Sequence, residues 1–361
     1  MKLKNGLRVY WRSRDEAQIG SDPRLTVTIA LEHPREFEIL QLLEKDQTVA
    51  SLRRKMQNLG GQRERVDELL RPLAEASLLQ PGSRNRSPEL EVNPDARDML
   101  AAEADSRALM ESNSWRQMVN RGRQCVSIYG LGRTGAHIAM GLANAGVGLL
   151  QLNDPSPVAP RDRGQVYSRH HIGLTRSEAL ARIIQDQGLQ CRIRTAGRWQ
   201  QPQAAVLVDY EVSDPNRSAF LSSHGVAHLS VTIGELSISC GPWVPSSAGP
   251  CLRCLRLWAV EADPYWPGVA TQQFVRSSVA ARGEDSTMAS VIGGLGVSEI
   301  LSGLAGRRPF TAGRSITMSL PSYAIEWHDV DPHPQCKAHH PKTLNRSDPA
   351  PPPVLPLPPA P

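Results

Sequence analysis

A glycine-rich loop between an apolar strand and a helix is the feature that most restricts the fold of this chain. Gly130, Gly132 and Gly135 have G-x-G-x-x-G spacing and directly follow an apolar run. Glycines so placed permit a tight turn, let the backbone approach a phosphate and let the helix pack on the strand. Asp154 lies 24 residues after Gly130, where a carboxylate can bind a ribose hydroxyl. The pattern predicts a Rossmann-like nucleotide site; the alternative is the same turn with a lapsed site.

Strands alternate with helices from residue 123 onward, which predicts an α/β domain with a mostly parallel sheet. The expected strands are 125–129, 148–152 and 204–208, and the expected helices are 134–144, 177–187 and 286–304.

The first eighty residues predict a smaller α+β domain. Three short strands are expected, followed by three helices, an order that suggests a winged helix-turn-helix. Thr48 is expected to cap the second helix, and Val66, Leu69, Leu70 and Leu73 recur at helical spacing in the third. The expected strands are 7–11, 17–19 and 25–29, and the expected helices are 34–43, 48–59 and 62–79.

Composition marks the remaining segments. Asn93 and Pro94 are typical of an N-cap and a first helical residue, and they predict the start of a polar connecting helix after a linker. Eight of the last thirteen residues are proline, which predicts an extended or disordered tail. The expected parts are a recognition domain at 1–80, a linker and helix at 81–122, the α/β domain at 123–340 and the tail at 341–361.

Charge and hydropathy argue against nucleic acid and membrane partners. The chain has 41 basic and 36 acidic residues, a net charge of +5, and no block of like charge. The third expected helix mixes arginines with acidic residues, which would repel a phosphate backbone. The longest stretch without charge, 134–153, holds four glycines and is too polar to span a membrane. With no signal peptide at the start, we expect a cytoplasmic protein.

Three of the six cysteines form a metal-binding pattern. Cys251 and Cys254 make a C-x-x-C pair, and Cys336 with His339 makes a C-x-x-H pair later in the chain. Thiolate and imidazole ligands at this spacing suit a closed tetrahedral zinc site with a structural role. The competing interpretation is a buried, reduced cysteine pair without metal. The alternatives for the fourth ligand are His333 and His340.

Four further motifs resemble the ThiF and ubiquitin-activating-type adenylyltransferases. They are Asn144–Gly148, Leu152–Asp154, Pro250–Cys254 and Gly293–Glu299. The resemblance implies ATP and Mg²⁺ binding, adenylation of a peptide or protein carboxylate, and a homodimer. The cofactor contacts it implies are Gly130, Gly132, Gly135, Asp154, Arg163, Arg176 and Asp214.

Several positions depart from the active pattern of that family. The segment 161–165 lacks the family's asparagine, and Arg176 replaces its ATP-contacting lysine. The family's D-x-x-D-N motif becomes Asp209–Asp214, with altered spacing. A planar guanidinium does not occupy a point-charge site as an ammonium does. No cysteine lies between Cys254 and Cys336, which excludes a thioester mechanism at the family's usual position. These departures weigh against adenylation.

Three motifs in order resemble one branch of the family, the Ocin-ThiF-like leader-peptide-binding proteins of thiazole/oxazole-modified peptide biosynthesis. The first, Gln18–Arg24, resembles the opening of a PqqD-like recognition element. The resemblance implies a protein that binds the leader of a ribosomal precursor peptide and docks a YcaO-type cyclodehydratase. The other two motifs are Cys251–Leu255 with Asp263–Pro267, and Trp327 with His333–Cys336.

The expected strand 25–29 offers an open edge to such a leader. Backbone groups on an edge strand can pair with an extended peptide, while nearby apolar side chains fix its register. The third helix would supply those side chains, unless they fill the domain core instead. The candidate peptide-binding residues are Leu25, Thr26, Val27, Thr28, Ile29, Arg63, Val66, Leu70 and Leu73.

The leading hypothesis is a non-catalytic protein that presents a precursor peptide to a cyclodehydratase for azoline formation. The alternative is an active ATP-dependent adenylyltransferase that acts on a peptide carboxylate or amide. An NAD(P)-dependent oxidoreductase would fit the glycine loop but explains neither the cysteine pair nor the N-terminal domain.

Overall fold

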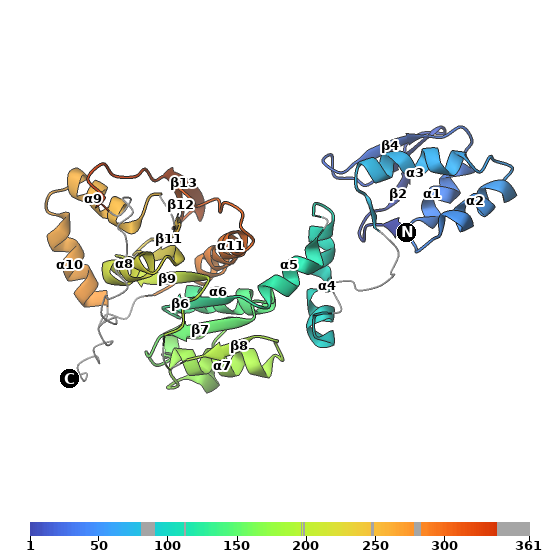
Figure 1. Cartoon of the computed structure of the whole chain (residues 1–361). Helices are drawn as coiled ribbons and strands as arrows, with labels where there is room; N and C mark the ends of the chain where they lie inside the picture. The colour runs from blue at the N-terminus through green and yellow to red at the C-terminus, as the bar shows by residue number, and fades with distance from the viewer. Residues whose placement is uncertain are drawn as a thin grey trace. The chain divides into compact units, whose positions relative to one another are not determined.

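The structure is a computed structural model that describes residues 1–80, 91–111, 113–195, 197, 199–246, 249–277 and 283–337. Two units can be distinguished, Met1–Asn120 and Arg121–Pro361 (Figure 1). The expected linker at 81–88 and the proline-rich tail lie outside the described residues.

The first unit contains a three-stranded antiparallel sheet with three helices. The sheet has the order β2 (Val9–Trp11), β3 (Glu16–Ile19), β4 (Val27–Ala30), and β1 (Lys2–Leu3) pairs separately with β5 (Leu79–Gln80). The helices are α1 (Glu36–Leu42), α2 (Val49–Asn58) and α3 (Arg65–Glu75). Thr48 accepts a hydrogen bond from the Ser51 amide at 3.0 Å, which confirms it as the N-cap of α2.

Helix α4 (Pro94–Ala108) belongs to the same unit. Asn93 caps it, as the sequence predicts. Asn5 donates a hydrogen bond to Asp105 of α4 at 2.8 Å, so this helix packs on the N-terminal segment as well as leading onward. The next helix is α5 (Ser114–Arg121).

The second unit is built on an eight-stranded sheet in the order β13-β12-β11-β10-β9-β6-β7-β8. The strands from β10 to β8 run parallel, and β11, β12 and β13 are antiparallel to their neighbours. This confirms the expected mostly parallel sheet. The strands are β6 (Cys125–Tyr129), β7 (Leu149–Asn153), β8 (Arg192–Arg194), β9 (Ala204–Tyr210), β10 (Ala227–Ile233), β11 (Ser237–Val244), β12 (Arg314–Ser319) and β13 (Ala324–Asp329).

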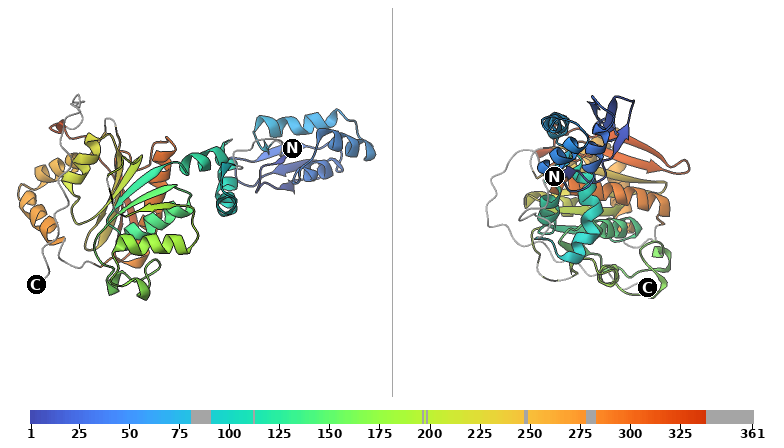
Figure 2. Two further views of the ribbon diagram at one scale, coloured as in Figure 1. Left: turned by 60° about the horizontal axis from the view of Figure 1, so that its bottom comes forward. Right: turned by 90° about the vertical axis from the view of Figure 1, so that its right-hand side faces the viewer.

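Helices cover both faces of this sheet (Figure 2). They are α6 (Arg133–Asn144), α7 (Arg176–Asp186), α8 (Pro215–Ser223), α9 (Leu252–Ala262), α10 (Trp266–Ser277) and α11 (Ser286–Leu304). In β9, Val206 and Val208 pack with α6, α7 and α11, whereas Ala205 and Leu207 pack with α8 and α9. A strand buried on both faces is apolar throughout, which explains why its sequence shows no alternation.

Among the described helices, α11 is long and apolar enough to cross a membrane. Its residues Met288, Ile292 and Ile300 are buried in the core cluster of the second unit, where α11 packs against α6 and β11. This is the environment of a core helix.

Candidate functional site

The glycine loop follows β6 and is held by close backbone contacts. Gly130 has a φ of +84°, and a Cβ there would lie 2.2 Å from the carbonyl oxygen of Val208. A Cβ on Gly135 would lie 2.0 Å from the carbonyl oxygen of Gly130. Glycine is therefore required at both positions, by the left-handed turn and by the close approach of α6.

A carboxylate of the chain itself lies at the N-terminus of α6. Glu284, only 9% exposed, accepts hydrogen bonds from the amides of Arg133 at 3.1 Å and Thr134 at 2.7 Å. It also accepts from the hydroxyls of Thr134 at 2.7 Å and Tyr210 at 2.5 Å. A Cβ on Gly132 would lie 2.2 Å from this carboxylate. Free amides at a helix N-terminus favour an anion, and Glu284 supplies it here.

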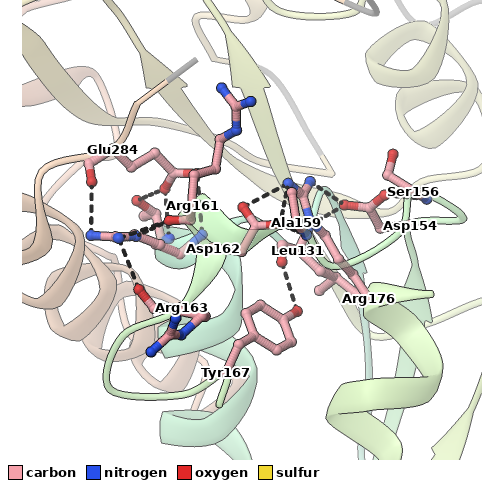
Figure 3. A network of polar contacts seen from close by, with 12 residues as sticks. Leu131, Asp154, Ser156, Ala159, Arg161, Asp162, Arg163, Tyr167, Arg176 and Glu284 are labelled. Carbon is pink, nitrogen blue, oxygen red and sulfur yellow. Dashed lines mark hydrogen bonds and ion pairs between the residues drawn. The ribbon is translucent and has the colours of Figure 1, made fainter. Parts of the chain in front are cut away.

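Asp154, the expected ribose ligand, is engaged by partners within the chain (Figure 3). Its carboxylate accepts hydrogen bonds from the Leu131 amide at 2.8 Å and the Ser156 amide at 2.9 Å, and it pairs with Arg176 at 3.2 Å. Arg176 also forms a bidentate pair with Asp162, from Nη2 at 2.9 Å and from Nε at 3.1 Å. Burial alone would lower the pKa of Arg176, but the carboxylates of Asp154 and Asp162 outweigh it, and the pKa is raised above its ordinary value. Arg176 therefore stays charged and binds carboxylates.

The Arg133 side chain binds the loop that contains Arg161 and Arg163. Its guanidinium donates to the carbonyl oxygens of Arg161 at 2.7 Å and Arg163 at 2.8 Å, and to the Ser286 hydroxyl at 2.7 Å. Arg163, an expected phosphate ligand, thus contributes its backbone here while its side chain is exposed. The cavity that the described residues leave at this place is about 10 Å³, room for about one water molecule.

The acidic segment after β9 is also engaged. Asp214 caps α8 by accepting hydrogen bonds from the amides of Asn216 at 2.9 Å and Arg217 at 3.3 Å. Arg217 lies 3.5 Å from Asp214 and 3.7 Å from Asp209. Burial raises the pKa of Asp209 to about 6, although Arg217 opposes the shift. The Asp214 carboxylate is therefore engaged by the start of α8 and by Arg217.

The three expected cysteine ligands meet in one buried cluster. The sulfur of Cys251 lies 3.8 Å from that of Cys254 and 3.7 Å from that of Cys336. All three sulfurs lie within 4.8 Å of one another and could hold a metal ion. The start of α9 supplies two of them, and the segment after β13 supplies the third.

Of the three histidines expected as a fourth ligand, His333 alone lies within the described residues. The Nε2 of His333 contacts Glu261 at 2.9 Å, and its Nδ1 accepts a hydrogen bond from the Gln335 amide at 3.1 Å. Both nitrogens of His333 are therefore engaged elsewhere. His339, the expected ligand, and His340 lie outside the described residues.

The outer edge of β4 carries free backbone groups. The Leu31 amide donates to the carbonyl oxygen of Asp15, the residue before β3, at 2.7 Å. Because backbone directions alternate along an antiparallel pair, Ile29 and Val27 also direct their backbone groups toward β3. Thr28 and Ala30 therefore direct theirs outward. Within the described residues, no hydrogen bond reaches the backbone amide or carbonyl of Thr28. The expected open edge is present, although the strand begins at Val27 and not at Leu25.

The apolar residues expected to anchor a peptide are core residues. Val66 and Leu73 of α3 are fully buried, and Leu70 is 8% exposed. Their burial favours the alternative that they fill the core of the first unit. Arg63 is exposed and precedes α3, while Leu25 lies in the turn before β4.

Sequence inspection missed Glu284 and its hydroxyl partner Tyr210. Glu284 precedes Asp285, the N-cap of α11, so the start of that helix is locally visible. Nothing local shows that the preceding carboxylate caps α6, because Thr134 lies 150 residues away.

The fold is also found in solved structures of other proteins. No protein-family model and no curated protein matches the chain. A crystal structure of E. coli MccB with MccA-N7isoAsn has a TM-score of 0.65 at 12% identity, covering 94% of this chain and 99% of that one. The structure of the microcin C7 biosynthetic enzyme MccB in complex with N-formylated MccA has a TM-score of 0.66 at 14% identity, with the same coverage of both chains. The chain has a ThiF-type fold. PaaA gives a TM-score of 0.68 at 14% identity, covering 90% of this chain and 98% of PaaA. At these identities, the likeness establishes the ThiF-type architecture and leaves the activity to the residues of the site.

Proposed function

We propose that this protein binds the leader of a ribosomal precursor peptide and presents the peptide to a YcaO-type cyclodehydratase for azoline formation, without activating the peptide itself. The observation that carries the proposal is the Glu284 carboxylate at the N-terminus of α6, in the place of a phosphate. The first unit is the PqqD-like winged-helix recognition domain, the second is an Ocin-ThiF-like body, and the protein acts in the cytoplasm.

Glu284 weighs against nucleotide use because a phosphate has to displace it. Displacement breaks four hydrogen bonds to a buried carboxylate, and each such bond to a charged group contributes about 1.5–3 kcal/mol. A ribose would likewise compete with the Arg176 pair for Asp154. The ATP-dependent step therefore belongs to the partner enzyme.

The edge of β4 supports peptide capture. An extended peptide can exchange two backbone hydrogen bonds with Thr28, which gives affinity without a fixed sequence. The structures of MccB, which shares the fold, include complexes with the precursor peptide MccA.

Peptide-dependent ATP–pyrophosphate exchange tests the proposal. The purified protein is tested with each short peptide encoded beside its gene. We expect no pyrophosphate exchange above background with any of them, and binding of one of them with a Kd of about 0.1–10 µM. Thr28→Pro removes the outward amide and should weaken that binding at least about 10-fold. Thr28→Ala, which keeps the amide, is the matched control. Robust exchange would overturn the non-catalytic assignment, and no peptide binding would overturn presentation.

The thiol cluster supports a structural zinc ion. Thiolate sulfurs about 2.3 Å from a tetrahedral zinc ion lie about 3.8 Å from one another, and the distances from Cys251 to Cys254 and Cys336 are 3.8 Å and 3.7 Å. We assign the fourth position to His339, with His340 as the alternative. When bound, the ion fastens the segment around Cys336 to α9.

A homodimer through β13 is the proposed oligomeric state. The two edges of the large sheet differ, since β8 exposes Arg192 and Arg194, charges that protect an edge strand. β13 instead exposes Ile325 (48%) and Trp327 (63%). Their partners on β12, Met318 and Ile316, lie on the same face of the sheet and are buried. An uncovered apolar sheet face of this kind is typical of an interface.

Trp327→Glu is expected to raise the dissociation constant of the dimer at least about 10-fold, because a charge replaces an apolar contact at the symmetry-related edge. Sedimentation velocity over a concentration series measures it. Tyr265→Glu, a change at a more exposed aromatic in the turn between α9 and α10, should leave the dimer intact. A monomeric wild-type protein at micromolar concentration would contradict this assignment.

The second candidate function is an active adenylyltransferase. Its support is the likeness to MccB, for which a structure with ATP is known. In that case Glu284 and Arg176 would leave their present partners, and Mg-ATP would be held by Gly130, Gly132, Gly135, Asp154 and Asp214. The exchange assay separates the two candidates.

A further inference from the structure

The free edge of β4 ends at a guanidinium. Arg65, the first residue of α3, donates from Nη2 to the carbonyl oxygen of Ala30 at 2.9 Å. Ala30 directs its backbone outward, so this carbonyl is the acceptor that an added strand would use two residues after Thr28. An added strand can therefore pair with Thr28 in full, but at Ala30 its amide has to share the carbonyl oxygen with the Arg65 guanidinium that lies beside it.

Three carboxylates hold Arg65 in this position. Its Nε and Nη2 lie 3.0 Å and 3.2 Å from the two oxygens of Glu36, a bidentate pair whose side chains are 17% and 7% exposed. Its Nη1 lies 2.8 Å from Glu68 and 3.5 Å from Glu32. Moving Arg65 away from Ala30 would leave the buried Glu36 without its cationic partner, a costly change. The contact with Ala30 is therefore a fixed part of the edge.

We propose that Arg65 is the register-determining residue of the peptide edge: it stops strand pairing at Ala30 and so selects peptides that leave the sheet there. This rests on the proposed function, because it concerns the peptide that β4 binds. The bound peptide needs an amide opposite Thr28 but none opposite Ala30. Its recognised segment is a short extended stretch that accepts proline, which has no amide hydrogen, at the position opposite Ala30.

A proline scan of a bound peptide tests this role. The probe is a peptide selected from a random display library for binding to the full chain. It is kept only if it binds the Thr28→Pro variant more weakly than the wild type. With the wild type, proline opposite Thr28 should weaken binding at least about 10-fold, and proline two residues beyond should change it less than about 2-fold. In the double variant Arg65→Met/Glu36→Leu the Ala30 carbonyl is free, and proline at that second position should weaken binding at least about 5-fold.

The control and the alternatives make the outcomes distinct. Arg71→Met removes an exposed arginine from the same helix and should give the wild-type scan. The double variant replaces a buried ion pair with apolar side chains, an exchange that folded proteins tolerate; if it fails to fold, Arg65→Lys, which keeps the charge but loses the fork, takes its place. Identical scans for wild type and variant would overturn the role of Arg65 while peptide binding stands. If no selected peptide responds to Thr28→Pro, both this role and capture by β4 are overturned.

Discussion

Cys254→Ser is expected to lower bound zinc from about one equivalent per chain to below about 0.2, and to destabilise the second unit by at least about 3 kcal/mol. Cys254 is fully buried and shares the thiol cluster with Cys251 and Cys336. A serine hydroxyl is a poor ligand for zinc, and without the ion the remaining thiols no longer fasten the segment after β13 to α9. Metal analysis of freshly purified protein and urea unfolding measure the two effects.

Cys191→Ser is the matched control, because Cys191 is also buried but lies outside the cluster. It should keep its zinc while losing some stability from the buried hydroxyl. Wild-type protein with less than about half an equivalent of zinc would contradict the assignment. It would leave a reduced cysteine pair as the better interpretation of the motif.

Acid is expected to destabilise the second unit through His228. Burial lowers the pKa of His228 to about 4, although a hydrogen bond with the Val226 carbonyl opposes the shift. An unfolded histidine takes up a proton near pH 6.5. Between pH 6.5 and pH 4 the unfolded state therefore binds more protons than the folded state, and the free energy of unfolding decreases as the pH is lowered. From about pH 7.5 to about pH 4.5 this one residue should remove about 2.5 kcal/mol from the free energy of unfolding.

His228→Gln isolates this contribution. Its amide can replace the contacts of the ring with Val226 and with the Ser218 hydroxyl at 2.9 Å, and it does not titrate. The free energy of unfolding of the variant, relative to wild type, should therefore rise by about 2.5 kcal/mol as the pH falls over this range. A difference that stays flat would show that the His228 ring protonates freely in the folded protein.

Elements with strong local signals could be predicted from the sequence. The strand at 125–129 and the helix at 286–304 have the bounds observed for β6 and α11. The third helix was expected to run to Leu79 but ends at Glu75, because Ser77 takes a positive φ of 54° and breaks the helical path. The strands β10 to β13 have weaker local patterns and are ordered mainly by their neighbours in the sheet.

The site was predictable only in part, for the same reason. The residue types that mark a nucleotide crevice are present, and the cysteines meet as their spacing predicts. What engages the crevice is non-local: Arg176 reaches Asp154 across 22 residues, and Arg65 reaches Ala30 from another element. Such contacts depend on how the elements pack, and motif spacing alone does not contain that information.

The contact between Thr134 and Glu284 also sets an order of events during synthesis. The first turn of α6 needs a carboxylate that the ribosome makes 150 residues later. Until then the amides of Arg133 and Thr134 lack this acceptor. The α/β domain therefore gains this contact late in synthesis, when Glu284, which lies just before α11, has been made and links the start of α11 to the start of α6.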